Sequence, residues 1–590
     1  MPTSTARETC LRSGWNRPLS QCGTAAIVVL LLSLTACTVV PPAQDTDAAS
    51  VPAWAEEAVW YQIFVERFAN GDSSNDPTLN DIAGSWQDDH PSDWKVTPWT
   101  HNWYEQEDWA KATGRDFYYT VQMRRYGGDL AGVLNHLDYL QDLGITAIYF
   151  NPIYDAPSLH KYDARSYHHI DRNFGPDPIG DRALSATEDP ADPSTWVWTA
   201  ADSLFLQLLG EIHARGMRAI MDVSWNHTGV TFWAWRDVLE KQARSRFASW
   251  YDVEQFDDPE TSTNEFTYDG WAGVGTLPAF RKVGVPEDFH GGPVDGDLVA
   301  GVKAHVFAVT RRWMDPDGDG DPSDGVDGFR LDVADQVPLG FWRDYRMLVK
   351  SINPDAYLVG EVWWEDWPDR MMDPRPYLGD VFDAVMNYQW YMPTRSFFAS
   401  ALPPRNATGY LAHLDSVESG IPLRNLRAMM NVAASHDSPR LSTSLHNPGK
   451  YKFGVNPRDN PGYRVSRPGE RTRLMQKMLL MQQFTYHGAP HIWYGDEVGM
   501  WGADDPDCRK PMMWSGLNYE PEDQGPDGSP QPPDEVQPDT ALHRYYRDLI
   551  QLRRSKSRLF VGGDIDYTIM DDDAGLLSYR RTLPGDSLTI

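Results

Sequence analysis

Short apolar runs alternate with amphipathic stretches along most of this chain. Apolar residues recur at helical spacing between many of the runs, as in Leu204–Arg215. Runs that are apolar on both faces and separated by helices are typical of buried parallel strands. Eight such runs predict an α/β fold of the (β/α)8, or TIM-barrel, type, with a doubly wound sheet as the alternative. The predicted strands are Val59–Val65, Ala147–Asn151, Ala219–Val223, Val326–Asp332, Tyr357–Glu361, Ala384–Asn387, Arg427–Ala433 and His491–Tyr494.

Segments that depart from this alternation divide the chain into predicted parts. We expect the barrel domain to span residues 56–558. Residues 172–202 are rich in Pro, Asp and Thr and predict a long loop, whereas residues 229 to about 300, after the third strand, predict an inserted subdomain. Residues 559–590 change to short strand-like runs. They predict the start of a C-terminal β-domain, which we expect to be incomplete.

The first 37 residues are typical of a targeting segment. Three arginines within the first 17 residues precede a mainly apolar run over 24–36, which is too short for a comfortable membrane span. The run ends in Leu-Thr-Ala-Cys37 and resembles a bacterial lipobox, in which Cys37 would carry the lipid. An uncleaved anchor and a simple secretory signal are the alternatives. We therefore expect residues 1–37 to be a lipoprotein signal peptide, 38–55 a flexible linker, and the protein an extracytoplasmic lipoprotein whose only membrane contact is that lipid.

Net charge, cysteine content and aromatic content restrict the possible binding partners and disulfides. The net charge of −31 repels phosphate backbones, which argues against a nucleic-acid partner. If Cys10 and Cys22 leave with the leader, Cys508 is the one unmodified thiol and no intramolecular disulfide can form. The 24 Trp and 27 Tyr supply aromatic faces of the kind that pack against sugars, although most such rings fill protein cores.

The fourth predicted strand ends in Gly-Phe-Arg-Leu-Asp, residues 328–332. Residues two apart on a strand point to the same face, so Arg330 and Asp332 project together. A guanidinium beside a carboxylate holds it ionised and oriented, as a nucleophilic aspartate requires. A structural ion pair is the alternative interpretation.

Other predicted strands end in polar groups as well. In a barrel, side chains from different strands converge where the strands end, and chemistry gathers there. The polar groups at four strand ends therefore predict a single site. They are Asp222, Asn226 and His227 after the third strand, Arg330 and Asp332 on the fourth, Glu361 after the fifth, and His436 and Asp437 after the seventh.

These four stretches resemble the signature regions of the α-amylase family, glycoside hydrolase family 13. The resemblance extends over about residues 57–560. More local features are similar to the neopullulanase, cyclomaltodextrinase and maltogenic amylase group. They are the stretches Tyr61–Asp72, His160–Asp163, Tyr494–Met500 and Asp505–Met512.

The resemblance implies roles for individual residues. Asp332 would be the nucleophile that forms a covalent β-glycosyl-enzyme, Glu361 the acid and then base, and Asp437 the third carboxylate, which stabilises the transition state. A retaining mechanism of this kind places the nucleophile and the acid about 5–5.5 Å apart. The tryptophans of Trp363–Trp367 would form an acceptor-side platform or pack the loop. Substrate-binding roles are implied for Tyr162, His227, Arg330 and His436.

Two acidic loops are candidate calcium sites. In the resembled group, the first loop binds structural calcium; the residues here are Asn70, Asp72, Asn75, Asp76, Gly127 and Asp129. A turn with solvated acids is the alternative. The second loop, with Asp315, Asp317 and Asp319, fits the first half of an EF-hand. It has Val326 where the closing Glu belongs, so that Asp321 or Asp324 would substitute, or the loop is a simple acidic turn.

The resemblance implies a retaining hydrolase of α-1,4-glucans or maltooligosaccharides, with cyclodextrins and pullulan as further candidate substrates. A transglycosylase using the same glycosyl-enzyme is the alternative, and a non-catalytic glycan-binding lipoprotein is a remote one. Neopullulanase-type enzymes generally carry an extra N-terminal β-domain that helps to build their dimer. Here the barrel begins about 20 residues after Cys37, which leaves no room for that domain, and we therefore expect a monomer, with a dimer left open.

Overall fold

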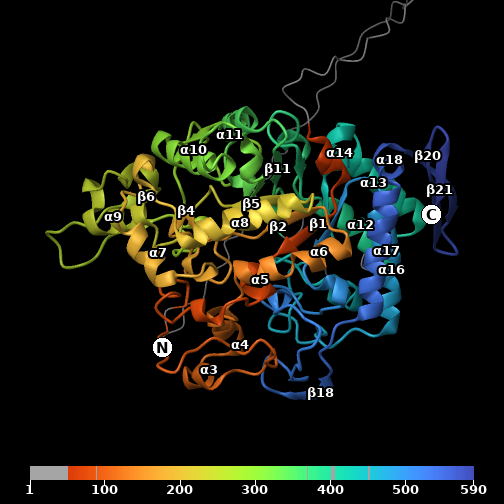
Figure 1. The fold of residues 1–590 in the computed structure, drawn as a ribbon, viewed down its shortest axis with the longest axis horizontal. Helices are drawn as coiled ribbons and strands as arrows, with labels where there is room; N and C mark the ends of the chain where they lie inside the picture. The colour runs from red at the N-terminus through yellow and green to blue at the C-terminus, as the bar shows by residue number, and fades with distance from the viewer. Residues whose placement is uncertain (1–50, 88, 368–369, 400–404, 450–451) are drawn as a thin grey trace, which may run out of the picture. The chain divides into compact units, whose positions relative to one another are not determined.

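The computed structural model describes residues 51–590 except 88, 368–369, 400–404 and 450–451. A barrel of eight parallel strands lies at its centre, with one strand from each predicted run (Figure 1). The strands are β1 (Trp60–Ile63), β2 (Ala147–Phe150), β5 (Arg218–Val223), β10 (Gly328–Leu331), β11 (Tyr357–Gly360), β14 (Ala384–Val385), β15 (Met430–Val432) and β16 (Ala489–Trp493). Their order around the sheet is β14-β11-β10-β5-β2-β1-β16-β15, and a parallel bridge from Met386 to Met430 joins its two ends. The predicted TIM barrel is confirmed.

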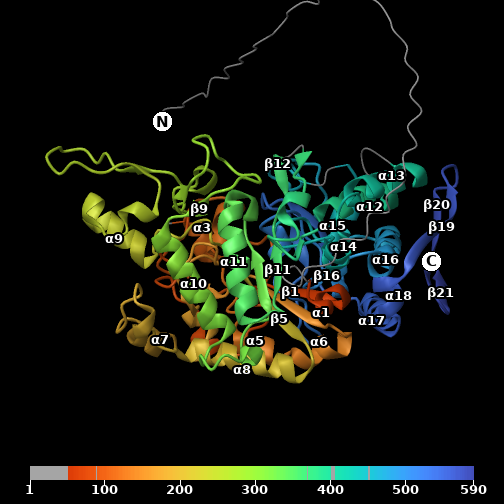
Figure 2. The same ribbon diagram turned by 90° about the horizontal axis from the view of Figure 1, so that it is seen from above.

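Helices surround the strands and bury their outer faces. α10 and α11 lie side by side, as both views show (Figure 2). α8 begins with a capping box in which Thr199 and Asp202 bond each other's backbone, and it buries Phe205 and Leu208 against the sheet. The principal helices are α5 (Leu130–Asn135), α6 (Leu137–Leu143), α8 (Ala200–Ala214), α10 (Ala300–Met314), α11 (Leu339–Ile352), α12 (Tyr388–Phe398), α16 (Glu470–Thr485) and α17 (Thr540–Ser555).

Strand register brings the polar residues of the fourth strand to their partners. Arg330 on β10 is paired with Asp222 on β5, so the two side chains occupy one layer of the barrel interior. Gly328 makes the close approach of β10 to β11 possible: its φ is +148°, and a Cβ there would lie 2.0 Å from the carbonyl oxygen of Tyr357. Packing therefore requires glycine at the start of the Gly-Phe-Arg-Leu-Asp stretch. The polar residues Arg330 and Asp332 lie at its end.

Several short elements lie outside the barrel. Between β5 and α10 are α9 (Trp233–Lys241) and the antiparallel pairs β6–β7 and β8–β9, whose strands are Val253–Gln255, Thr267–Tyr268, Lys282–Val283 and Asp297–Leu298. These elements occupy the predicted insertion, whose boundaries stay a prediction. β3 (Tyr154–Asp155) and β4 (Ser166–Ile170) form another antiparallel pair. The C-terminal part is an antiparallel sheet of β19 (Asp564–Asp571), β20 (Leu576–Leu583) and β21 (Asp586–Thr589).

The segment 172–202 differs from the predicted loop. It contains α7 (Pro178–Ser185), and the first turn of α8 falls at its end. Asp177 caps α7 through its side chain and Pro178 occupies its first turn, so the Asp and Pro residues read as loop signals in fact start a helix.

Residues 1–50 are outside the described part of the chain, so the predicted leader, the lipidated Cys37 and most of the linker have no structural description. Among the described residues, no helix is both long enough and apolar enough to span a membrane.

Candidate active site

Arg330 is the centre of a buried charge cluster at the carboxyl ends of the barrel strands. Its Nη1 donates to both oxygens of Asp222, at 2.9 and 3.0 Å, and to Asp332 Oδ1 at 2.7 Å. Its Nη2 lies 2.8 Å from Glu361 Oε1, as an ion pair without hydrogen-bond alignment. One guanidinium therefore holds three carboxylates, which fixes the predicted nucleophile and the predicted acid near each other.

The charges of this cluster do not balance. Burial raises the pKa of Asp332 well above its ordinary value, and the neighbouring charges of Glu361 and Asp222 add to the rise against the opposing effect of Arg330. We expected Arg330 to keep Asp332 ionised, but one cation is outnumbered by the carboxylates around it. A retaining glycosidase needs one carboxyl of its reacting pair to carry a proton and act as an acid.

Val333, directly after Asp332, has a strained backbone conformation and contacts Glu361. Val333 adopts a left-handed conformation with φ +46°, which is rare for a β-branched residue. In this conformation its N–H donates to Glu361 Oε2 at 3.1 Å. Strained backbone at such a place is typical of functional sites. The unfavourable conformation lets the fourth strand orient the carboxylate of the fifth.

Tyr162 links this cluster to the seventh strand. Its hydroxyl donates to Asp222 Oδ2 at 2.8 Å and lies 2.6 Å from His436 Nε2. The Tyr162 and His436 rings stack with centroids 5.6 Å apart. Gln62 donates to His436 Nδ1 at 2.9 Å, so Nε2 carries the proton in the neutral imidazole. Two of the predicted substrate-binding residues are thereby held rigidly at one side of the mouth.

Asp437 lies beside a histidine and two cationic side chains. It lies 2.7 Å from His436 Nε2 and 2.9 Å from Arg509 Nη2, and Lys452 Nζ donates to its backbone carbonyl. Burial alone would raise the pKa of Asp437, but His436, Arg509 and Lys452 hold it well below its ordinary value. This carboxylate therefore stays ionised in the free site.

His227 lies beneath the inserted elements. Its ring stacks on Trp271 with centroids 5.3 Å apart, and burial lowers the pKa of His227 to about 3. Its Nε2 is buried and has no hydrogen-bond partner among the described residues. An unpaired buried nitrogen costs free energy unless a ligand completes it, which agrees with the predicted contact to substrate.

The aromatic run after Glu361 has two distinct parts. Trp363 is buried and stacks on Tyr388, with ring centroids 4.0 Å apart and planes 5° apart. Trp367 is 50% exposed. Lys452 Nζ lies 5.6 Å from the ring centroid of Trp363 and 5.8 Å from that of Trp367. Trp363 therefore packs the loop, and Trp367 offers a face to solvent.

Comparison with known proteins identifies the family of this chain. A family model described as "Alpha amylase, catalytic domain" matches residues 62–186 and 200–562. The chain belongs to the α-amylase family. It is a glycoside hydrolase of that family, as the sequence predicted.

Several relatives and solved structures resemble this α-amylase-family chain over most of its length. Neopullulanase 2 of Thermoactinomyces vulgaris is 34% identical over 90% of this chain and 68% of that protein. An intracellular maltogenic amylase of Bacillus subtilis (strain 168) is 30% identical over 92% of this chain and 69% of that protein. A solved cyclic alpha-maltosyl-(1→6)-maltose hydrolase from Arthrobacter globiformis, in complex with maltose, has a TM-score of 0.63 at 27% identity and covers 91% of both chains.

The predicted location of the protein is wrong. We expected an extracytoplasmic lipoprotein anchored to the cell envelope, on the basis of the apolar run and Cys37. The Bacillus subtilis relative, which matches 92% of this chain, bears the name of an intracellular enzyme and contradicts that expectation. A short apolar run with flanking arginines is a compositional signal, and such signals arise without a lipid anchor.

In this α-amylase-family chain, side-chain oxygens of the first predicted calcium loop lie crowded together. Asn75 Oδ1 is buried without a partner among the described residues. A Cβ at Gly127 would lie 2.0 Å from Asp76 Oδ1 and 2.6 Å from Asn70 Nδ2, so only glycine permits this approach. Burial, with nearby acids, raises the pKa of Asp76 to about 6. Oxygen donors crowded together in this way suit calcium.

Two further residues of the predicted calcium loop make hydrogen bonds within it. Asp129 accepts hydrogen bonds from the backbone N–H groups of Gly71, Asp72 and Gly132 and thus organises the loop. The Asp72 side chain accepts from Ser74 and caps a short helical turn.

Three acidic residues of the second predicted calcium loop lie close together. Single carboxylate oxygens of Asp315, Asp317 and Asp324 all lie within 4.8 Å of one another. Asp319 is not in this group, because its carboxylate accepts the N–H of Asp321 within its own turn. Asp324, one of the two residues expected to substitute for the missing Glu, is in this group.

Sequence reasoning missed several residues of the site. Arg509 donates to the carbonyl of His436 and pairs with Asp437, although it lies in the Asp505–Met512 stretch that pointed to the subgroup. Gln62 lies in another such stretch. A search for the cation that must accompany a third ionised carboxylate would have found Arg509; Gln62 gave no comparable signal.

Proposed function

We propose that this enzyme is a retaining hydrolase of α-1,4-linked glucans, acting on maltooligosaccharides by double displacement. Asp332 and Glu361 are both held on Arg330 at neighbouring strand ends, and this observation carries the proposal. The names of the relatives, a neopullulanase, a maltogenic amylase and a cyclic maltosyl-maltose hydrolase, support an α-glucan as substrate. Cyclodextrins and pullulan are included as candidates.

In the first step, Asp332 attacks the anomeric carbon and the bond from that carbon to the leaving oxygen breaks. Glu361 gives its proton to the leaving oxygen, and a β-glycosyl ester on Asp332 results. Val333 N–H donates to Glu361 Oε2 and thereby orients the carboxyl that acts as the acid.

In the second step, Glu361 accepts a proton from water, and the water oxygen attacks the same carbon. The ester bond breaks, Asp332 is released as a carboxylate, and two displacements restore the α-configuration. A sugar hydroxyl in place of the water would give transglycosylation instead. Trp367, which is half exposed beyond Glu361, is suited to hold either a leaving or an accepting sugar by stacking.

The remaining residues bind and stabilise the reacting sugar. Asp437, kept ionised by its cations, accepts hydrogen bonds from sugar hydroxyls and stabilises positive charge at the anomeric carbon. His227 Nε2 completes its hydrogen bond with a sugar oxygen, and Tyr162 stacks beneath the ring. Each of these groups is held by protein contacts before substrate arrives, which lowers the reorganisation that the transition state requires.

The products of defined glucans test the proposal. Wild type should release reducing sugar from starch, maltotriose, β-cyclodextrin or pullulan, whereas Asp332→Asn and Glu361→Gln should lose that activity. Glu361→Gln should retain more activity on an α-glucosyl fluoride than on maltotriose, because fluoride leaves without a proton. No turnover of any α-glucan by wild type, or unchanged activity in Asp332→Asn, would refute the proposal.

We also propose that the loop with Asn70, Asn75, Asp76 and Gly127 binds structural calcium. Dialysis against a chelator should lower the melting temperature, and added calcium should restore it, because an ion that binds the folded state stabilises it. Asp76→Asn should abolish this response. Asp315→Asn, the matched change in the second loop, should preserve it. An equal melting temperature with and without calcium would contradict the proposal.

A further inference from the structure

A cluster of imidazoles and carboxylates lies at the antiparallel pair β3–β4 and has no part in the proposed reaction. Nε2 of His168 and Nε2 of His169 lie 2.6 and 3.0 Å from the same oxygen, Glu188 Oε1. All three side chains are nearly fully buried. The three atoms lie within 4.8 Å of one another, which is the spacing of a metal-binding group.

The backbone of β4 is irregular where these two histidines occur. Tyr154 pairs with Ile170 whereas the next residue, Asp155, pairs with Ser166, so one step on β3 spans four residues on β4. Consecutive side chains on a regular strand point to opposite faces. The bulge removes that alternation, and the rings of His168 and His169 come to lie with centroids 4.5 Å apart.

Every other polar atom of these three side chains has its own partner. His169 Nδ1 lies 2.8 Å from Asp202 Oδ2, and His168 Nδ1 lies 3.1 Å from Ser166 Oγ. Glu188 Oε2 accepts the N–H of Val197 at 3.1 Å. A carboxylate or hydroxyl that orients the far nitrogen of a histidine is the usual support of a metal ligand. Within the part of the chain that the structure describes, only the two histidine Nε2 atoms and Glu188 Oε1 have no partner outside this group, and these three atoms lie close together.

Neighbouring rings fix the ligands and add a third imidazole. Trp196 stacks on His168 with ring centroids 4.2 Å apart and planes 7° apart. The ring of His305 lies 6.0 Å from that of His168, edge on. His305 is 6% exposed, and its Nε2 is buried without a hydrogen-bond partner among the described residues. A buried nitrogen without a partner beside two converging imidazoles is explained if a further ligand belongs there.

We infer that His168, His169 and Glu188 form a binding site for a divalent transition-metal ion, with Zn²⁺ as the best match. Two imidazoles and one carboxylate suit Zn²⁺, Co²⁺ or Ni²⁺, whereas calcium takes oxygen ligands. Metal–ligand bonds of about 2.0–2.2 Å in a tetrahedral site place the ligand atoms about 3.3–3.5 Å apart. Glu188 Oε1 therefore has to move outward by less than about 1 Å. The fourth position is open to water or His305.

The ion would join segments that are distant in sequence. Glu188 lies between α7 and α8, the two histidines lie on β4, and Asp202 belongs to the first turn of α8. None of the residues proposed to act on substrate touches the three ligands. The role of the site is thus to hold the 172–202 segment to the barrel, and its loss changes stability rather than the chemical step.

Cobalt titration of the full, metal-stripped chain without a histidine tag tests the site. We expect one Co²⁺ per chain, with visible absorption bands of a four-coordinate ion, and displacement of the bands by Zn²⁺. His168→Gln and His169→Gln should each weaken binding by at least about 100-fold, since removal of a ligand costs more than the 10–100-fold loss of its support. Zn²⁺ should raise the melting temperature of wild type but not of His169→Gln.

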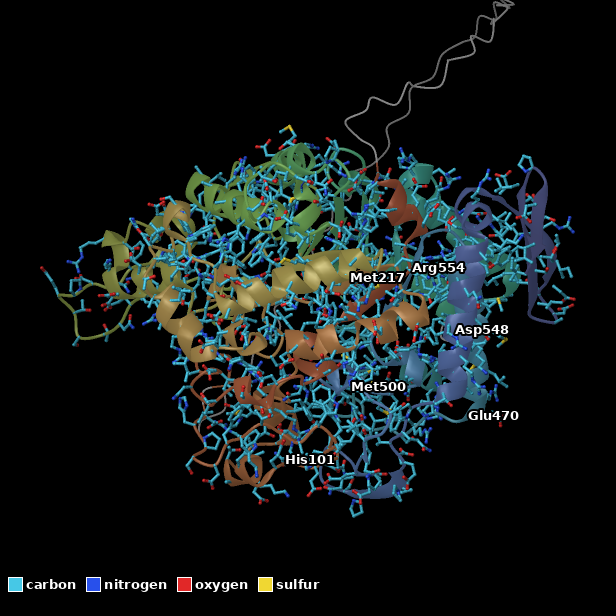
Figure 3. The ribbon with its side chains drawn as sticks, in the orientation of Figure 1. His101, Met217, Glu470, Met500, Asp548 and Arg554 are labelled. Atoms are coloured by element: carbon cyan, nitrogen blue, oxygen red, sulfur yellow. The ribbon has the colours of Figure 1, made fainter. Side chains whose placement is uncertain are left out.

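His101→Gln is the matched control. His101 with Glu105 and Glu520 is the other cluster with an imidazole among the described residues, but it has a single nitrogen ligand and an exposed Glu520. His101 lies in the lower part of the view in Figure 3, whereas α7 lies higher and to the left in Figure 1, which has the same orientation. The variant should keep the cobalt bands and the Zn²⁺ response.

The inference is overturned if wild type gives no cobalt bands, if the bands survive in both His168→Gln and His169→Gln, or if they disappear in His101→Gln. Should either β4 variant fail to fold, X-ray absorption of Zn²⁺-loaded wild type decides the question. Two imidazole ligands support the site, and a coordination shell without them refutes it.

Discussion

Asp332 and Asp437 lie at the ends of barrel strands on opposite sides of the site, and their surroundings carry opposite charge. Asp332 shares one guanidinium with two other carboxylates, and its pKa is raised. Asp437 faces His436, Arg509 and Lys452, and its pKa is lowered. The comparison teaches that burial alone does not set ionisation at this site. The ratio of cations to carboxylates decides the direction in which each pKa moves.

The largest difference between the two aspartates should appear in catalysis. Asp332→Asn should lower kcat by about 10⁴-fold or more, the scale on which removal of a nucleophile acts in other hydrolases. Initial rates on maltotriose would measure it. Asp344→Asn, on α11 beside Lys303, is the control and should leave kcat unchanged. A loss of less than tenfold in Asp332→Asn would show that another group attacks the sugar.

Asp437→Asn should have a smaller effect on the same reaction. A group that stabilises charge without forming a bond is expected to contribute about 10²–10³-fold to kcat. The ratio of kcat in the two variants is the informative quantity. If Asp437→Asn lost more activity than Asp332→Asn, the assigned roles would be reversed.

Stability should change in opposite directions. A carboxyl whose pKa is raised in the folded state destabilises the protein as pH rises above the ordinary aspartate value of about 4. At pH 7, Asp332→Asn should therefore raise the melting temperature. A carboxyl whose folded pKa is lowered gives stability above that value and loses it as pH falls towards the folded pKa. Asp437→Asn should therefore lower the melting temperature at pH 7, by the equivalent of about 2 kcal/mol.

Calorimetry from pH 7 down to pH 4 would follow both variants against wild type. The Asp332→Asn difference should shrink as pH falls, whereas the Asp437→Asn difference should stay nearly constant, because Asp437 loses its stabilising effect only below about pH 4. Changes of the same sign in both variants at pH 7 would contradict the contrast in charge.

The smallest effect concerns Arg509. Arg509→Met removes one cation from Asp437, so the pKa of that carboxyl moves up towards its ordinary value. The acid limb of the melting temperature below about pH 4, where Asp437 loses its stabilising charge, should then end at higher pH by about one unit or less. Arg509→Lys keeps the charge and should resemble wild type. An identical acid limb in Arg509→Met would mean that His436 and Lys452 are sufficient.

The fold followed from local patterns, and only half of the site did. Eight apolar runs between helices were enough to place all eight strands, because buried parallel strands have a continuous apolar signature. The pairing of Arg330 with Asp332 follows from the alternation of side chains along one strand. These features depend on neighbours in sequence.

The other half of the site depends on contacts between distant segments. Arg509 reaches Asp437 from a loop after β16, and Asp222 meets Arg330 through strand register. The raised pKa of Asp332 required a count of the carboxylates around one cation. The left-handed Val333 reflects strain that surrounding packing sustains, and a β-branched residue gives no sign of it in sequence.

Trapping of the glycosyl-enzyme tests the central claim most directly. Wild type treated with a slow fluorinated α-glucosyl fluoride should accumulate a covalent adduct, and peptide mass spectrometry should place the added sugar on Asp332. The same treatment of Asp332→Asn should give no adduct. An added sugar on Glu361 or Asp437, or rapid turnover that gives the β-anomer without any adduct, would contradict a retaining mechanism with Asp332 as the nucleophile.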